Sequence, residues 1–259
     1  MPELSEAARQ QGELWGADVS GWLDMQRRFM PPLHNFVLDR LEIRPGERLL
    51  DAGCGAGGAS HLARLRGAEV AGFDPSEGML QAAAAAYPEV PFRVGELENI
   101  PFPDSTFDAA MAINSLQFTP APARGLLELI RVTRPASRIA VVVWNQEHSE
   151  QRVVFDAIRA LFPKPPSGRG AFELAGPGEL ERLLEGLRFS IEEIDIPFSF
   201  NDLDSAVRAQ MGTGPSQRAA QILGREAVED ALRRSMSEFI QPDGSLSARN
   251  RFRCALVQR

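Results

Sequence analysis

A short apolar strand followed at once by an acid and four closely spaced glycines constrains the fold of this chain more than any other feature. The stretch spans residues 48–58, where Leu49 and Leu50 supply the apolar run and Asp51 ends it. Glycine is needed where the backbone takes a positive φ angle or comes close to a ligand. A strand, a glycine loop and a helix in this order direct backbone N–H groups and the positive end of a helix into one crevice. The stretch therefore predicts a binding site for a nucleotide-sized cofactor.

Two classes of cofactor compete for this loop. The spacing Gly53-x-Gly55-x-x-Gly58 satisfies the dinucleotide-binding pattern. The spacing Asp51-x-Gly53-x-Gly55-x-Gly57 resembles the first motif of the class I S-adenosylmethionine (SAM) methyltransferases, which place an acid just before the glycines. A carboxylate at that position would repel a pyrophosphate and would suit a cationic group, such as the amino group of a methionine moiety. The residues that follow must therefore decide between the two classes.

Composition limits the class of protein and its partners. The 259 residues are enough for one large α/β domain with an inserted cap. Hydrophobic residues make up 44% and charged residues 24%, which is usual for a globular protein. The net charge of −7 makes the chain a poor candidate for binding nucleic acid, because phosphate binding relies on basic patches. We therefore expect no nucleic-acid partner.

Cysteine and histidine usage gives no sign of a disulfide or a metal site. Cys54 and Cys254 are predicted to be buried, reduced thiols, and His34, His61 and His148 are too widely separated to suggest a metal site. No apolar run approaches the roughly 20 residues that a membrane span needs. The N-terminal residues lack the basic and apolar regions of a signal peptide. We expect a cytoplasmic protein without a membrane span, present as a monomer or a homodimer.

A second acid follows the next predicted strand. That strand runs from Ala68 to Asp74, and the carboxyl ends of neighbouring parallel strands face one crevice. An acid at this position is able to accept hydrogen bonds from ribose hydroxyls. The other interpretation is a helix N-cap, since Asp74 and Ser76 precede an alanine-rich helix. Both hold together if Ser76 caps the helix and Asp74 binds ribose.

A longer resemblance decides between the cofactor classes. Residues 95–108 read GELENIPFPDSTFD and resemble a segment of the ubiquinone-biosynthesis-type (UbiE-like, type 11) SAM methyltransferases. In that family an acid after the third strand meets the adenine amino group. Glu96 holds this position here, where aspartate is more usual. This chain departs from the family pattern at two places. Gln117 and Phe118 stand where many relatives carry histidine, and residues 135–137 replace a Pro-Gly-Gly turn.

The resemblance implies a fold and its division. We expect an α/β, Rossmann-like, seven-stranded and mostly parallel sheet with an antiparallel last strand. Residues 1–45 are predicted to form a helical N-terminal lid, and residues 46–259 the methyltransferase domain with a helical cap insert at about 201–244. A long strand is expected at 189–200, and the Pro/Gly-rich loop at 163–170 is interpreted as a flexible lid.

The resemblance also assigns the cofactor site. Asp51, Gly53 and Gly55 would hold the methionine moiety, and Asn114 would line the sulfonium end. The ribose and adenine would be met by Asp74, Pro75, Met79, Glu96 and Leu97.

The helical arm before the first strand carries aromatic residues with two open interpretations. Trp15, Trp22 and Phe29 either pack against the domain or cover the cofactor crevice and face the substrate. We also predict that Pro31 and Pro32 break the arm, with a second helix over about 33–41.

The implied reaction is transfer of a methyl group from SAM to an O, N or C nucleophile of a small, largely apolar molecule. The leaving group is built into the cofactor, so the protein mainly aligns the reactants. If the acceptor must lose a proton, a general base is needed. His148 is the first candidate because it follows the fifth strand, and His34 is the second. A structural surface or core histidine is the competing interpretation for each.

Two other functions stay open. One is an NAD(P)-dependent oxidoreductase, against which stand Asp51, the Glu96 segment and the lack of a Tyr-x-x-x-Lys pair around Tyr87, the only tyrosine. The other is a non-methylating protein that keeps the SAM fold and binds the cofactor structurally.

Overall fold

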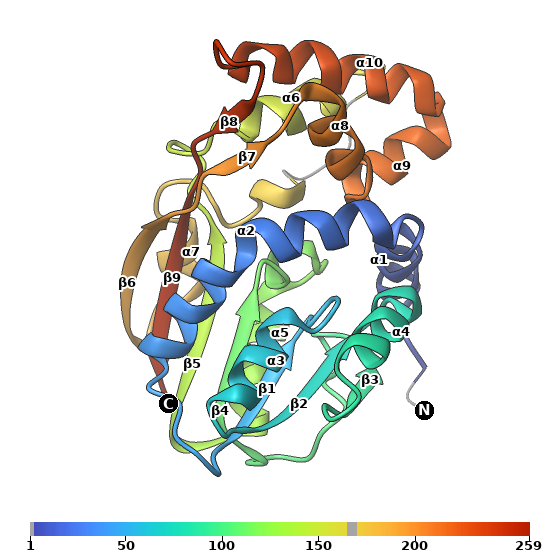
Figure 1. Cartoon of the computed structure of the whole chain (residues 1–259). Helices are drawn as coiled ribbons and strands as arrows, with labels where there is room; N and C mark the ends of the chain where they lie inside the picture. The colour runs from blue at the N-terminus through green and yellow to red at the C-terminus, as the bar shows by residue number, and fades with distance from the viewer. Residues whose placement is uncertain (1–2, 165–169) are drawn as a thin grey trace.

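The computed structural model describes residues 3–164 and 170–259, and its centre is one sheet of seven strands (Figure 1). Their order is β3-β2-β1-β4-β5-β9-β6. Neighbours among β1 to β5 pair in parallel, and β9 pairs antiparallel with both β5 and β6. The predicted fold class is therefore confirmed. The bounds are β1 (Arg48–Ala52), β2 (Glu69–Asp74), β3 (Phe92–Val94), β4 (Phe107–Ile113), β5 (Thr133–Trp144), β6 (Arg188–Asp195) and β9 (Arg251–Gln258).

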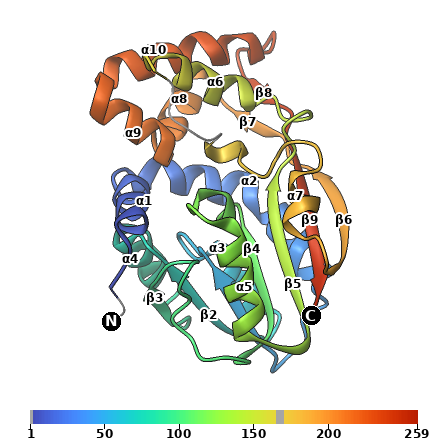
Figure 2. The same ribbon diagram turned by 180° about the vertical axis from the view of Figure 1, so that it is seen from behind.

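Helices cover both faces of the sheet (Figure 2). The second half of α2 (Val19–Arg40) and α3 (Gly58–Leu65) pack on one face, while α5 (Pro122–Val132) and α7 (Glu179–Leu183) pack on the other. Strand β5 joins the two cores, because Ala140 and Val142 belong to one and Val141 and Val143 to the other. Outside the segment between β7 and β8, the other helical elements of the described residues are α1 (Glu6–Gly16), α4 (Glu77–Ala86), α6 (Arg152–Ala160), η1 (Leu116–Phe118) and η2 (Gly170–Phe172).

The predicted break at Pro31 and Pro32 is wrong, because α2 runs through both prolines. Each proline inside a helix costs about 3 kcal/mol. Burying one large apolar side chain contributes roughly 1.5–3 kcal/mol, so six of them outweigh two prolines. The six buried apolar side chains of α2 are Met25, Phe29, Met30, Leu33, Val37 and Leu38. Tertiary packing therefore overrides the local preference.

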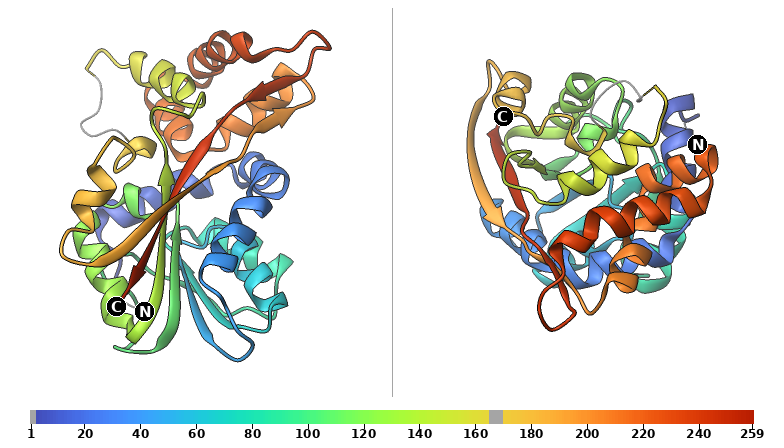
Figure 3. Two further views of the ribbon diagram at one scale, coloured as in Figure 1. Left: turned by 90° about the vertical axis from the view of Figure 1, so that its left-hand side faces the viewer. Right: turned by 90° about the horizontal axis from the view of Figure 1, so that it is seen from above.

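A two-stranded ribbon carries the chain from the sheet into a helical cap (Figure 3, left). Strand β6 continues into β7 (Phe198–Phe200), and β8 (Leu246–Ala248) continues into β9. The two halves are linked where the Ile196 N–H donates to the Asn250 carbonyl at 2.8 Å. The single strand predicted for 189–200 is thus divided at Ile196 and Pro197.

The cap consists of three helices and a short helical turn between β7 and β8. They are α8 (Leu203–Met211), α9 (Gly214–Leu223), α10 (Arg225–Met236) and η3 (Ser237–Phe239). The helix α6 packs against α10, so it joins the cap although it precedes the insert in sequence (Figure 3, right). The predicted flexible lid at 163–170 lies largely outside the described residues, which leave out 165–169.

The N-terminal arm lies between the cap and the sheet (Figure 1). Its close packing depends on glycine: a Cβ on Gly12 would lie 2.3 Å from the Pro75 carbonyl oxygen, and a Cβ on Gly21 would lie 2.7 Å from the Arg208 carbonyl oxygen. One glycine thus lets the arm touch the start of α4, and the other lets it touch the cap. No helix in the described ranges is long and apolar enough to cross a membrane.

Replacing Gly12 by alanine tests this packing. Helix propensity alone would stabilise the protein by about 1 kcal/mol. The contact with the Pro75 backbone predicts the opposite sign, a loss of about 1–3 kcal/mol, because backbone yields less easily than a flexible side chain. Urea unfolding of Gly12→Ala measures the difference. The exposed Gln10→Ala on the same helix is the control, and a Gly12→Ala variant as stable as wild type would contradict the close contact.

Candidate active site

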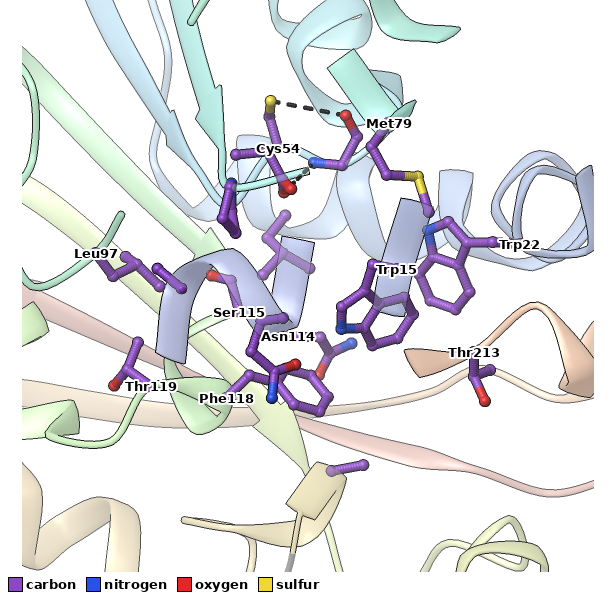
Figure 4. A pocket seen from close by; sticks show the side chains of 18 of the residues that line it. Trp15, Trp22, Cys54, Met79, Leu97, Asn114, Ser115, Phe118, Thr119 and Thr213 are labelled. Carbon is purple, nitrogen blue, oxygen red and sulfur yellow. Dashed lines mark hydrogen bonds between the residues drawn. The ribbon is translucent and has the colours of Figure 1, made fainter. Parts of the chain in front are cut away.

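A cavity of about 1370 Å³, its open mouth included, lies where β1, β2 and β4 end (Figure 4). The arm and the cap supply its other walls. All nine residues predicted to bind the cofactor line it, although their contacts with a cofactor stay predictions. They are Asp51, Gly53, Gly55, Asp74, Pro75, Met79, Glu96, Leu97 and Asn114.

The glycine loop is held close to the carboxyl ends of β2 and β4. The N–H groups of Gly53 and Cys54 both donate to the Phe73 carbonyl, at 2.9 and 3.0 Å. Gly53 has a φ of 77°, and a Cβ there would lie 2.4 Å from the Cβ of Ser115. The Ser115 hydroxyl donates to the Ala52 carbonyl at 2.7 Å. Only glycine therefore fits this position, and the loop is fixed without a ligand.

Asp51 is a buried acid with one strong partner. It is the penultimate residue of β1, is 2% exposed, and its Oδ2 accepts a hydrogen bond from the Ser60 hydroxyl at 2.6 Å. Burial is the main cause that raises the pKa of Asp51 to about 7; the Ser60 hydrogen bonds oppose this shift, and the neighbouring Asp74 charge adds to it. Since no basic side chain among the described residues forms an ion pair with this carboxylate, a positively charged ligand group would stabilise its ionised form.

Asp74 ties the glycine loop to the start of α4. Its Oδ2 accepts from the Gly55 N–H and its Oδ1 from the Ser76 N–H, both at 2.9 Å. Burial raises the pKa of Asp74 to about 6 despite these two donors. Ser76 is the N-cap of α4, and its hydroxyl accepts from the Met79 N–H at 3.3 Å. Both interpretations of this segment are therefore compatible, because each Asp74 oxygen keeps a second lone pair for a ligand.

Glu96 has a partner that the sequence did not indicate. Its Oε2 accepts from the backbone N–H of Ser5 at 3.1 Å and from the Ser5 hydroxyl at 2.5 Å. Ser5 is also the N-cap of α1, accepting from the Ala8 N–H at 3.2 Å. The arm is thereby fastened to the edge of the cavity across 91 positions of sequence.

Every charged side chain among the described residues that line the cavity is acidic. The four acids are Asp51, Asp74, Glu96 and Glu98, and this lining includes no lysine or arginine. In a crevice with little water, like charges interact strongly. The lining therefore disfavours the pyrophosphate of a dinucleotide and suits a cationic ligand such as SAM.

The structure separates the two histidine candidates. His34, on α2, lines the cavity, and burial lowers its pKa to about 4, so the imidazole is uncharged at neutral pH. His148 is exposed beyond the end of β5, where its Nδ1 lies 3.2 Å from Asn145 Oδ1, and it does not line the cavity. His61 also lies elsewhere, with its ring stacked on Tyr87.

The arm aromatics divide between the two earlier interpretations. Trp15 and Trp22 line the cavity, with ring centroids 4.8 Å apart, and Trp15 lies 5.4 Å from Phe118 (Figure 4). Phe29 instead belongs to the core, where it stacks on Phe198 at 5.0 Å. Two of the three rings thus cover the cavity and one is a packing residue.

Two buried glutamines of the cavity escaped the sequence analysis. Gln151 is the N-cap residue of α6, and Gln210 lies on α8. Neither motif nor spacing marks Gln151. Gln210 gives only a weak signal, since it lies between the apolar residues Ala209 and Met211. Leaving such an amide unpaired costs roughly 1–3 kcal/mol.

The other sequence expectations concern cysteines and metals. Cys54 and Cys254 are both free and buried, as predicted. Among the described residues, no group of three or more His, Cys, Asp or Glu side chains is arranged to hold a metal ion.

Known proteins resemble this chain in sequence and in fold. A family model described as a methyltransferase domain matches residues 50–141. A demethylmenaquinone methyltransferase of Paenarthrobacter aurescens (strain TC1) is 32% identical over 52% of this chain and 56% of its own length. Such alignments cover about half the length of the first curated relatives.

Two further relatives extend the likeness over most of the chain. A malonyl-[acyl-carrier protein] O-methyltransferase of Enterobacter lignolyticus (strain SCF1) is 30% identical over 80% of both proteins. The crystal structure of geranyl diphosphate C-methyltransferase from Streptomyces coelicolor A3(2) has a TM-score of 0.59 at 17% identity and covers 98% of both chains, which shows a shared fold. On this sequence relationship, with the strand order and the acidic glycine-loop site, the chain belongs to the class I SAM-dependent methyltransferases.

Proposed function

We propose that this protein transfers a methyl group from SAM to an O, N or C nucleophile of a small, largely apolar molecule. The observation that carries the proposal is the division of one cavity into two kinds of wall. Acids and the glycine loop line the side formed by the strand ends. Methionine and aromatic side chains from the arm, β5 and α6 line the other side, including Met25, Met30, Trp144 and Phe155.

The acidic side fits SAM by its chemistry. Asp51 would meet the amino group, with Gly53, Gly55 and Asn114 around the methionine part. Asp74 would accept from the ribose, and Pro75, Met79, Glu96 and Leu97 would surround the adenine. SAM supplies, when bound, a methyl group already activated on a sulfonium sulfur.

The protein contributes alignment and exclusion of water. Trp15, Trp22 and Phe118 cover the cavity, and the Ser5–Glu96 hydrogen bond holds the arm in place. Alignment of two reactants can supply roughly 7–11 kcal/mol of a barrier. Where the acceptor must lose a proton, we assign that role to His34 rather than His148, because only His34 lines the cavity. Its lowered pKa makes it a weak base, which suits an acceptor that is itself acidic or strongly nucleophilic.

The acceptors named for the relatives cannot all be assigned to this chain. The Streptomyces structure holds Mg²⁺ and geranyl diphosphate. We do not extend a diphosphate acceptor to this chain, since the described cavity lining includes no lysine or arginine. The cytoplasmic location, the monomeric or homodimeric state and the absence of a nucleic-acid partner stay predictions.

Methyl transfer is tested by formation of S-adenosylhomocysteine (SAH). The purified protein is incubated with SAM and a panel of small apolar phenols, amines and enols, and SAH is quantified by mass spectrometry. We expect SAH that depends on one class of acceptor, together with an acceptor product heavier by one CH₂. Tight SAH binding with no turnover of any acceptor would favour the non-methylating alternative.

The pH dependence of SAH binding tests the role of Asp51. In the ligand-free protein, the Asp51 carboxyl has a pKa of about 7, so it is mostly protonated at pH 6 and mostly ionised at pH 7.5. Pairing with the SAH amino group requires the ionised form, and binding must therefore weaken as pH falls. We expect a dissociation constant about three- to tenfold higher at pH 6 than at pH 7.5.

The matched control for this profile is Asp51→Asn, which keeps the side-chain shape and removes the charge. It should bind SAH weakly at both pH values, with a ratio near one. Asp74 stays in the variant, and because loss of the neighbouring Asp51 charge lowers the Asp74 pKa, any pH dependence that survives in the variant is assigned to Asp74. An identical pH ratio in both proteins would contradict the assignment.

A further inference from the structure

Two buried amides in the cavity have unmet hydrogen-bonding capacity. Gln151 is 1% exposed, and neither its Nε2 nor its Oε1 has a partner among the described residues. Gln210 is fully buried, and its Oε1 has no partner either. Within the described part of the chain, its Nε2 donates to the Met25 sulfur, a weak acceptor, at 3.7 Å. Folded proteins rarely leave such atoms unpaired unless a ligand or water meets them.

The surroundings of these amides exclude a charged partner. The described cavity residues from α2, β5, α6 and α8 include no aspartate, glutamate, lysine or arginine. His34 is the one titratable group on these elements within the cavity, and its low pKa keeps it uncharged. An anion placed here would lose its hydration without gaining a cation, and a cation would lose its hydration without gaining a carboxylate.

An amide suits one class of ligand. It offers both a donor and an acceptor without charge, so it matches hydroxyl, carbonyl and amide groups. The neighbouring side chains, among them Met25, Trp144 and Phe155, provide an apolar surface for the rest of the molecule.

We propose that the methyl acceptor is an uncharged, mostly apolar molecule bearing neutral hydrogen-bonding groups, and that Gln151 and Gln210 are the residues that recognise those groups. The inference rests on the proposed function and names its acceptor class. The two glutamines are positioning and specificity residues here, since methyl transfer itself needs no proton from an amide.

The test uses matched probes and the full chain saturated with SAH. Binding of 2-naphthol, 2-naphthoate and naphthalene is measured by calorimetry at pH 7.5, in wild type and in a Gln151→Met/Gln210→Met variant. In wild type we expect 2-naphthol to bind at least tenfold more tightly than 2-naphthoate. In the variant, 2-naphthol should weaken about tenfold or more, while naphthalene binds as well as before or better.

The melting temperature of the ligand-free variant distinguishes a structural role of the glutamines from a role in recognising the acceptor. Methionine has a similar volume and removes the unpaired amides, so the ligand-free variant should melt at or above the wild-type temperature. Gln217→Met is the control, because the Gln217 Nε2 donates to the Met211 carbonyl at 2.6 Å and the residue does not line the cavity. That control should leave probe selectivity unchanged.

Several outcomes would overturn the inference. They are 2-naphthoate binding as tightly as 2-naphthol, unchanged 2-naphthol binding in the double variant, a fall of several degrees in its melting temperature, or no probe binding to the SAH-saturated protein. Failure of SAH itself to bind is a different result, which would count against the proposed function.

Discussion

The site depends on two buried carboxyl groups near the carboxyl ends of neighbouring strands. Asp51 is the penultimate residue of β1 and Asp74 is the last residue of the adjacent parallel strand β2, and burial raises the pKa of both. The protein stabilises them with hydroxyl and backbone donors from Ser60, Gly55 and Ser76, and with no cation among these partners. Above their pKa values the two ionised groups destabilise the ligand-free protein, and a cationic ligand would relieve that repulsion. The same charge is unfavourable to a dinucleotide, which explains how one glycine loop distinguishes between two cofactor classes.

The arm and the cap form the walls of the cavity that the sheet does not supply. Glycines at Gly12 and Gly21 allow the arm to contact the backbone of the sheet domain on one side and of the cap on the other. Trp15 and Trp22 are thereby placed over the cavity, and the Ser5–Glu96 hydrogen bond secures the start of α1. The side of the cavity lined by methionine and aromatic residues is thus assembled from segments far apart in sequence, namely the arm, β5, α6 and α8.

The sequence predicted the glycine loop and the acids near the strand ends from local patterns and from the rule that parallel strands share one crevice. The mostly parallel seven-stranded sheet was predicted from the family resemblance, and its strand order was not predicted. Features that depend on tertiary contacts were missed. Pro31 and Pro32 do not end the helix, because the buried face of α2 outweighs their local effect. His148 follows β5 in sequence, but its side chain is exposed and does not line the cavity. Gln151 and the partner of Glu96 carried no sequence signal, since only the closed fold shows which polar groups meet or lack a partner.

The most direct measurement is a calorimetric titration of the wild-type protein with SAH and, separately, with NADH at pH 7.5. The two ligands share an adenosine but differ in the charge presented beside the glycine loop. Selection by the acidic strand ends predicts saturable one-to-one binding of SAH and no detectable binding of NADH. Binding of NADH with an affinity equal to or greater than that of SAH would contradict the account.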